Sequence, residues 1–112
     1  MEDLTAKRCK PCEGGVEPMT LQEAEAQMRH LNGEWQLLDA GKALKRSFRF
    51  RDFLRTMSFV NAVAHIANIE DHHPDLEVGY DYCDVRYSTH AVRGLSENDF
   101  ICAAKIDRLA VQ

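Results

Sequence analysis

Three histidines in the second half of the chain have the residue type and spacing for acid–base chemistry. His72 and His73 are adjacent, between an acidic pair and Pro74, and His90 follows further along the chain. Imidazole has an unperturbed pKa of roughly 6.5, so it both donates and accepts protons near neutral pH. Two or three imidazoles in one pocket can therefore supply an acid and a base to the same small molecule. A His-His pair beside acids is also common in solvated loops, so its placement decides between these interpretations.

A metal site is the first alternative use of the histidines. Three imidazoles can hold zinc with one open position, but adjacent histidines rarely converge on one ion, and helical ligand pairs prefer a spacing of three or four. Cys9 and Cys12 form a CxxC motif, yet neither two further zinc ligands nor the βαβ context of a redox motif accompanies it. We therefore expect catalysis without a metal or cofactor, and the role of the CxxC motif stays open.

The elements around the histidines place them where catalytic groups are usually presented. Apolar residues recur at helical spacing from Asp52 to about Ile69, and Pro74 disfavours a helical conformation at His73. The pair therefore lies at a corner between a helix and a loop. Two strands are expected to follow, over residues 76–82 and 83–90, which puts His90 on the polar face at the end of the second strand.

The remaining elements complete an α+β fold. A capping box at Thr20 and Glu23 predicts a helix to about Leu31, and a hairpin is expected over residues 35–39 and 43–50. Ser96 and Asp99 fit the N-terminal cap of a last helix. The order α-β-β-α-β-β-α predicts a four-stranded antiparallel sheet with helices packed on one face.

Size and charge limit the function classes. The chain has 112 residues, enough for one core, and we expect a flexible tail over residues 1–19, because its glycines and Pro18 interrupt any periodic pattern, and a single domain over residues 20–112. The net charge is −4 with bases and acids interleaved, which argues against direct nucleic-acid binding. No stretch approaches the roughly 20 apolar residues of a membrane span and no secretory signal is visible, so we expect a cytoplasmic protein.

The predicted central helix carries more apolar surface than a small domain needs. Two neighbouring stripes cover about half of its circumference. The first consists of Phe53, Met57, Val60, Ala64 and Ala67, and the second of Phe59, Val63 and Ile66. We expect the second stripe to pack against another subunit, giving a homodimer or homotetramer.

The stretch EDHHPDLEVGYDYCDVRYSTH, followed by GLSENDF, closely resembles the pterin-4a-carbinolamine dehydratases. In that family a His-His-Pro, an aromatic residue, a strand end reading Ser-Thr-His and a Gly-Leu-Ser helix cap occur in this order. The similarity extends from about Leu31 to Leu109 and includes Trp35, whereas the CxxC motif lies outside it.

The resemblance implies a hydro-lyase that removes water from a 4a-hydroxytetrahydropterin, giving the quinonoid dihydropterin and supporting recycling of the tetrahydropterin after aromatic amino-acid hydroxylation. The pterin is the substrate rather than a cofactor. The family's active-site histidines match His72, His73 and His90, with His72 and His90 assigned to proton transfer and His73 to substrate binding.

The resemblance also implies roles for the neighbouring residues. Substrate contacts are expected at Asp71, Pro74, Ser88, Thr89 and Asn68, the last standing where many members carry an acid. Asp99, like Asp71, is expected to orient an imidazole.

An interaction module with the same fold is the alternative function, since animal members also act as dimerisation cofactors of a transcription factor. Such a module would bind its partner through the surface of the central helix, and it would have no chemical need for three histidines.

Overall fold

The computed structural model describes residues 3–11 and 16–109. In chain order the main elements are α1 (Leu21–Met28), β1 (Gln36–Leu38), β2 (Ala43–Arg49), α2 (Phe53–Glu70), β3 (Asp75–Val78), β4 (Tyr82–Tyr87) and α3 (Glu97–Leu109). Three short 3-10 helices accompany them, η1 (Leu4–Ala6), η2 (Asp39–Gly41) and η3 (His90–Val92). The predicted α-β-β-α-β-β-α order is confirmed.

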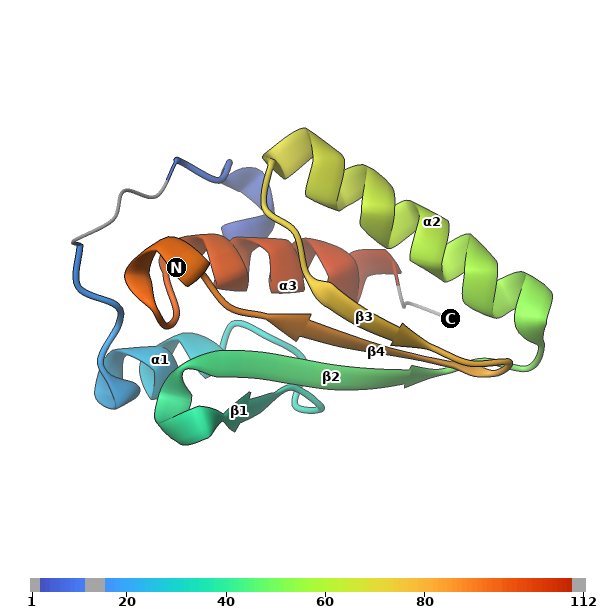
Figure 1. Ribbon diagram of the computed structural model, residues 1–112, viewed down its shortest axis with the longest axis horizontal. Helices are drawn as coiled ribbons and strands as arrows, with labels where there is room; N and C mark the ends of the chain where they lie inside the picture. Colours follow the sequence, from blue (N-terminus) through green and yellow to red (C-terminus); the bar gives the residue numbers. More distant parts are fainter. Residues whose placement is uncertain (1–2, 12–15, 110–112) are drawn as a thin grey trace.

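The four strands form one antiparallel sheet in the order β1-β2-β4-β3. β4 lies inside the sheet, and its alternating residues Cys83, Val85 and Tyr87 are fully buried. All four residues of the edge strand β3 are exposed. The helices cover one face of the sheet, as predicted, and Figure 1 shows α2 and α3 lying across it.

Side-chain caps begin α1 and α2. The Thr20 hydroxyl accepts from the Glu23 N–H at 3.1 Å while the Glu23 carboxylate accepts from the Thr20 N–H at 2.9 Å, which is the predicted capping box. α2 begins at a different kind of cap, in which the Asp52 carboxylate accepts from the Arg55 N–H at 2.9 Å. No helix in the described ranges is long and apolar enough to cross a membrane.

The second apolar stripe of α2 packs in the domain's own core, so it is not, as was expected, the surface left free for another subunit. Phe59 and Val63 of the second stripe are buried in the domain's own core. Along the first stripe Phe53 and Ala64 are exposed and Met57 is only partly buried, whereas Ala67 is buried and Val60 packs against the core. The periodicity showed that two apolar faces exist, but which of them meets the sheet depends on how the helix rotates about its axis, and the sequence pattern does not fix that rotation.

The β3–β4 hairpin turns earlier than expected. The sequence predicted the break between Tyr82 and Cys83, whereas β3 ends at Val78 and β4 begins at Tyr82. The Gly79 N–H donates to the Tyr82 carbonyl at 3.0 Å and closes the turn. Apolar and aromatic residues continue through Tyr80 and Tyr82, so the pattern does not mark the turn.

Arg46, which interrupts the alternation of β2, is explained by a partly buried acidic partner. Its guanidinium donates to Asp107 Oδ1 of α3 at 2.6 Å and lies 4.2 Å from the centre of the Phe48 ring. The indole N–H of Trp35 donates to the same oxygen at 2.7 Å. One carboxylate thereby ties β2 and the loop before β1 to the last helix.

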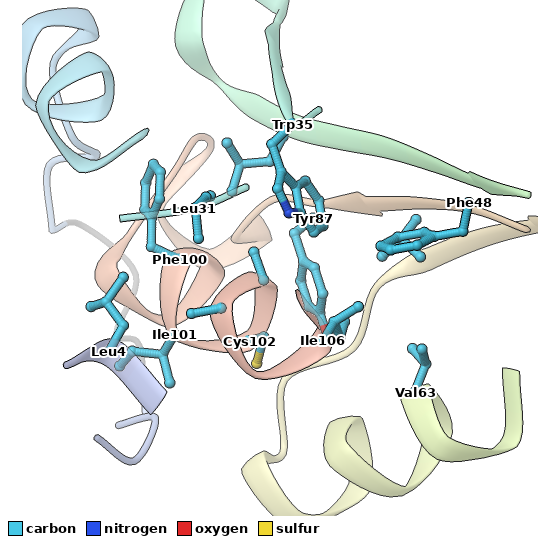
Figure 2. Packing of buried hydrophobic residues seen from close by; sticks show 14 of the residues in the cluster. Leu4, Leu31, Trp35, Phe48, Val63, Tyr87, Phe100, Ile101, Cys102 and Ile106 are labelled. Atoms are coloured by element: carbon cyan, nitrogen blue, oxygen red, sulfur yellow. The ribbon is translucent and has the colours of Figure 1, made fainter. Parts of the chain in front are cut away.

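Residues 3–11, called here the N-terminal segment, pack on the domain although the sequence predicted a flexible tail over residues 1–19. Leu4 is only 5% exposed and joins the main apolar cluster, which Figure 2 shows together with Ile101 and Cys102 of α3. The partners of the segment lie on α2 and α3, so no local pattern reveals its packing. Cys12 of the CxxC motif lies outside the described residues.

Candidate active site

The end of α2 places His72 at the edge of a cavity. Asp71 is the C-terminal cap of the helix and adopts a left-handed conformation, with φ of 51° and ψ of 43°. The His72 N–H then donates back to the Ala67 carbonyl at 3.2 Å. This reversal of the chain is the predicted corner between helix and loop, and it turns the His72 ring toward α3.

His72 is paired with a buried carboxylate. Its Nε2 lies 2.6 Å from Oδ1 of Asp99 in the first turn of α3, and the Asp99 side chain is fully buried. A carboxylate can only accept here, so Nε2 carries the proton. The other ring nitrogen, Nδ1, has no hydrogen-bond partner among the described residues and is the one left for a substrate.

The second carboxylate oxygen of Asp99 fixes the carboxylate in place. Asp99 Oδ2 accepts from the Thr89 hydroxyl at 2.7 Å and from the Ser96 N–H at 2.9 Å. The Thr89 and Ser96 hydroxyls also lie 2.8 Å apart. Asp99 therefore contacts His72 through Oδ1 and the N-terminal end of the last helix through Oδ2.

The surroundings of His72 favour its protonated form. Burial of the ring opposes the positive charge, but the hydrogen bond and the negative charge of Asp99 outweigh it, so the pKa of His72 is raised above its ordinary value of 6.5. The Tyr87 ring stacks on the imidazole with centroids 5.4 Å apart and planes 13° from parallel. The Tyr87 hydroxyl donates to the His72 carbonyl at 3.4 Å, so Tyr87 contacts both the ring and the backbone of the histidine.

A cavity of about 610 Å³ lies in front of this histidine. It is lined by the N-terminal segment, the end of α2, the residues after β4 and the start of α3. The lining residues are Cys9, Lys10, Pro11, Ile69, Glu70, Asp71, His72, His73, Ser88, Thr89, His90, Ala91 and Asn98. A cavity of this size is typical of sites for small molecules.

The structure brings most of the predicted site residues to this one cavity. All three histidines line it, together with Asp71, Ser88 and Thr89, and Asp99 lies behind His72. Asn68, on the exposed side of α2, and Pro74 are not among the lining residues. His90 begins the short helix η3, because β4 ends at Tyr87 and not at residue 90 as expected.

Three contributions to the cavity had no signal in the sequence pattern. Tyr87, a buried residue of β4, stacks on the His72 ring and supports it. Asn98 and the N-terminal segment form one wall. Glu70, next to the histidines in sequence, is buried and ion-paired with Lys105 at 2.7 Å. Glu70 stands two residues before His72, but the sequence does not identify Lys105 of α3 as its ionic partner.

The donors at the cavity do not form a metal cluster. Across residues 3–11 and 16–109, no group of three or more histidine, cysteine, aspartate or glutamate side chains is arranged to hold a metal ion. His72 already uses one ring nitrogen for Asp99.

Comparisons with known proteins agree on one family. The model of the family described as "Pterin 4 alpha carbinolamine dehydratase" matches residues 17–109. A protein of Nitrosomonas europaea named "Putative pterin-4-alpha-carbinolamine dehydratase" is 56% identical over 107 residues, which cover 96% of this chain and 93% of the relative. A relative of the same name from Legionella pneumophila is 51% identical over 109 residues, which cover 97% of this chain and 96% of the relative.

Solved structures show the same fold. The crystal structure described as a transcriptional coactivator/pterin dehydratase from Brucella melitensis is 34% identical, with a TM-score of 0.79 over 85% of this chain and all of the other. A pterin dehydratase-like protein described as a RuBisCO assembly factor is 22% identical with a TM-score of 0.62, over 70% of this chain and 92% of the other, a likeness of fold alone. By the family model and by its relatives, this chain belongs to the pterin-4-alpha-carbinolamine dehydratase family.

Proposed function

We propose that the chain is a hydro-lyase that dehydrates a 4a-hydroxytetrahydropterin to the quinonoid dihydropterin. The observation that carries this proposal is the buried Asp99 carboxylate behind His72, at a cavity that His73 and His90 also line, in a member of this family. A buried acid held by three donors supplies a histidine with a defined tautomer and a raised pKa.

The reaction needs one proton given and one taken. The C4a–O bond breaks, and the leaving oxygen takes a proton and departs as water. The N5–H bond gives its electron pair to a new C4a=N5 double bond, and its proton goes to a base. An acid and a base on one substrate, without a cofactor, are sufficient for this chemistry.

We assign the acid to His72 and the base to His90. A raised pKa keeps more of His72 in its protonated form near neutral pH, which suits a proton donor to the leaving oxygen. His90 is exposed at the cavity and takes the N5 proton. His73, with Asp71, binds and orients the ring.

Ser88 is the better candidate of the two strand-end residues for a backbone contact with the substrate. The Thr89 N–H already donates to the Gly94 carbonyl at 2.7 Å, and the Thr89 side chain is bound to Asp99. Contacts from Asn68 and Pro74 would need the substrate to extend beyond the cavity lining.

The test is the rate of 4a-hydroxytetrahydropterin dehydration, followed by ultraviolet absorbance. Wild type is compared with His72→Ala, His90→Ala and the matched control His65→Ala, whose side chain is exposed on α2. We expect kcat of His72→Ala and of His90→Ala to fall by about 100-fold or more, as for lost acid–base catalysis. The control His65→Ala should keep the kcat of the wild type. A wild type no faster than the uncatalysed reaction would refute the proposal.

We further propose a cytoplasmic homodimer or homotetramer formed through α2. Large apolar side chains remain uncovered on this helix, with Phe53 50%, Leu54 74% and Ile69 50% exposed. A partner surface would remove this apolar area from water. Sedimentation of wild type beside Leu54→Ser is the check, and a wild-type monomer at micromolar concentration would contradict the assembly.

The same exposed helix face supports the second candidate function, an interaction module that binds another protein. The two functions differ in what they need from the histidines. A module retains partner binding in His72→Ala and His90→Ala, whereas the dehydratase loses its activity in both.

A further inference from the structure

The N-terminal segment is fastened to the domain as a wall of the cavity. The Cys9 N–H donates to Glu70 Oε1 at 2.8 Å. The Asn98 side chain binds both backbone groups of Lys10, accepting from its N–H at 3.0 Å and donating to its carbonyl at 2.5 Å. Glu70 and Asn98 are both buried, and the segment lies outside residues 17–109 that match the family model.

Two thiols meet where this wall touches α3. The Sγ atoms of Cys9 and Cys102 are 3.5 Å apart. Cys102 is fully buried in α3, and its Sγ is 4.0 Å from the His72 carbonyl oxygen. Cys9 is half-buried and lines the cavity, so it is the sulfur that a small molecule can reach.

The surroundings of the pair favour one thiolate. The hydrogen bond with Cys9, together with the Tyr87 hydroxyl and the charge of His72, lowers the pKa of Cys102 despite its burial. The same hydrogen bond and burial raise the pKa of Cys9, so the proton of Cys9 must pass to Cys102 before Cys9 can attack. The thiolate is the nucleophile in disulfide chemistry. By contrast, burial raises the pKa of Cys83 to about 11.

We propose that Cys9 and Cys102 are a modification site, at which a low-molecular-weight disulfide oxidises them to a reversible disulfide that fixes the N-terminal segment as a wall of the cavity. The effect on substrate binding rests on the proposed function, whereas the formation of the bond does not.

The chemistry balances as two thiol–disulfide exchanges. The two thiols together lose one proton to solvent. The remaining proton lies on Cys102, so Cys9 is the thiolate, and it attacks one sulfur of the oxidant. The S–S bond of the oxidant breaks, and its first thiolate leaves and takes a proton. Cys102 then loses its proton and attacks the Cys9 sulfur, which expels the second thiolate of the oxidant. Two electrons pass from the cysteines to the oxidant, which becomes two thiols.

Bond formation must move the wall of the cavity. A disulfide has sulfurs about 2.05 Å apart, so the two Sγ atoms, now separated by 3.5 Å, have to approach each other. Cys102 is held in the core by α3, so the movement falls on Cys9 and its neighbours. Oxidation therefore changes the shape of the cavity beside His72, and we expect it to change KM more than kcat.

The test is mapping of the cysteines in the full chain after incubation with oxidised glutathione. Free thiols are alkylated under denaturing acid-quenched conditions and peptides are identified by mass spectrometry. Cys12→Ser serves as the parent because it removes the alternative CxxC pairing, and Cys9→Ser in that parent removes the proposed bond without changing a core residue. Cys83, buried in β4, is the internal control and should stay reduced.

We expect the parent to lose two alkylatable thiols, to yield a linked peptide pair containing Cys9 and Cys102, and to recover both thiols on reduction. The Cys9→Ser variant should keep both of its remaining thiols, Cys83 and Cys102, open to alkylation. In the wild type, a bond between Cys9 and Cys12 with Cys102 fully alkylated would overturn the proposal, and so would free thiols at both Cys9 and Cys102 in the parent after incubation with oxidised glutathione. KM for the hydroxypterin, or the dissociation constant of a stable dihydropterin, should shift in the oxidised parent alone. If the Cys9–Cys102 bond forms and this constant does not change, the N-terminal segment does not act as a wall of the cavity.

Discussion

Replacing Asp99 by asparagine tests the centre of the proposed mechanism with almost no change in side-chain volume. The wild-type carboxylate accepts from His72, Thr89 and Ser96 at 2.6 to 2.9 Å. Asparagine has one acceptor oxygen, so it cannot keep all three donors satisfied. It also removes the negative charge that raises the pKa of His72, leaving burial as the dominant influence, which lowers that pKa.

The expected losses concern both activity and stability. Without its protonated form near neutral pH, His72 no longer acts as an acid, and kcat should fall by about 100-fold or more. Hydrogen bonds to a charged group contribute about 1.5–3 kcal/mol each, so losing one or two of them should lower the free energy of unfolding by about 2–4 kcal/mol. Part of this cost depends on pH, because a raised pKa stabilises the fold below the unfolded value of roughly 6.5 and the effect is lost as pH rises through the folded pKa.

The assay combines dehydration kinetics with denaturant unfolding and an NMR titration of the His72 ring in Asp99→Asn. The gap in stability between wild type and variant should narrow as pH rises above about 6.5. A folded variant with kcat within about twofold of wild type, or with an unchanged His72 pKa, would show that the carboxylate does not act through His72.

Two further perturbations probe the support of the cavity. Burial opposes ionisation of Glu70, but the Cys9 N–H and Lys105 outweigh it and lower its pKa from 4.5 to about 2, which corresponds to about 3 kcal/mol of stability. Glu70→Gln should lose about that much in urea unfolding at pH 7, with the gap to wild type narrowing as pH falls from 4.5 toward 2, and the exposed Glu77→Gln should change stability by less than about 0.5 kcal/mol. Leu4→Ala should cost at least about 2 kcal/mol, because Leu4 is 5% exposed, whereas Val16→Ala, at a side chain 56% exposed and outside α2, should cost under about 0.5 kcal/mol. Equal effects would mean that the N-terminal segment does not pack in solution.

The sequence predicted the elements where local chemistry determines them. The capping boxes at Thr20 and Ser96 and the two hydrophobic periods located the helices and strands, because both signals act over a few residues. The same is true of the corner at Pro74, which places the histidine pair. Three histidines at one cavity follow from these local features together with the order of the strands.

The contacts that the sequence did not predict all join residues distant in the chain. Arg46 breaks the alternating pattern of β2, and its reason is the hydrogen bond to Asp107 of α3, 61 residues away in the chain. Leu4 is a single apolar residue among polar ones, and its burial depends on α3. A periodic pattern describes one element at a time, so it carries no information about a partner chosen by tertiary packing.

The two buried acids beside the cavity show why one of them acts on a histidine and the other does not. Glu70 is surrounded by cations, with Lys105 at 2.7 Å and Arg8 at 2.9 Å, so its charge is compensated within the fold. Asp99 has no lysine or arginine partner in the part of the chain that the structure describes, and neutral donors from Thr89 and Ser96 do not cancel its charge. Protonation of His72 is then the route by which this buried charge is neutralised, since a buried charge is costly unless it is paired. A histidine that gains a proton in this way can give it to a leaving hydroxyl, which is why we propose His72, with no lysine or arginine beside Asp99 in the described residues, as the acid.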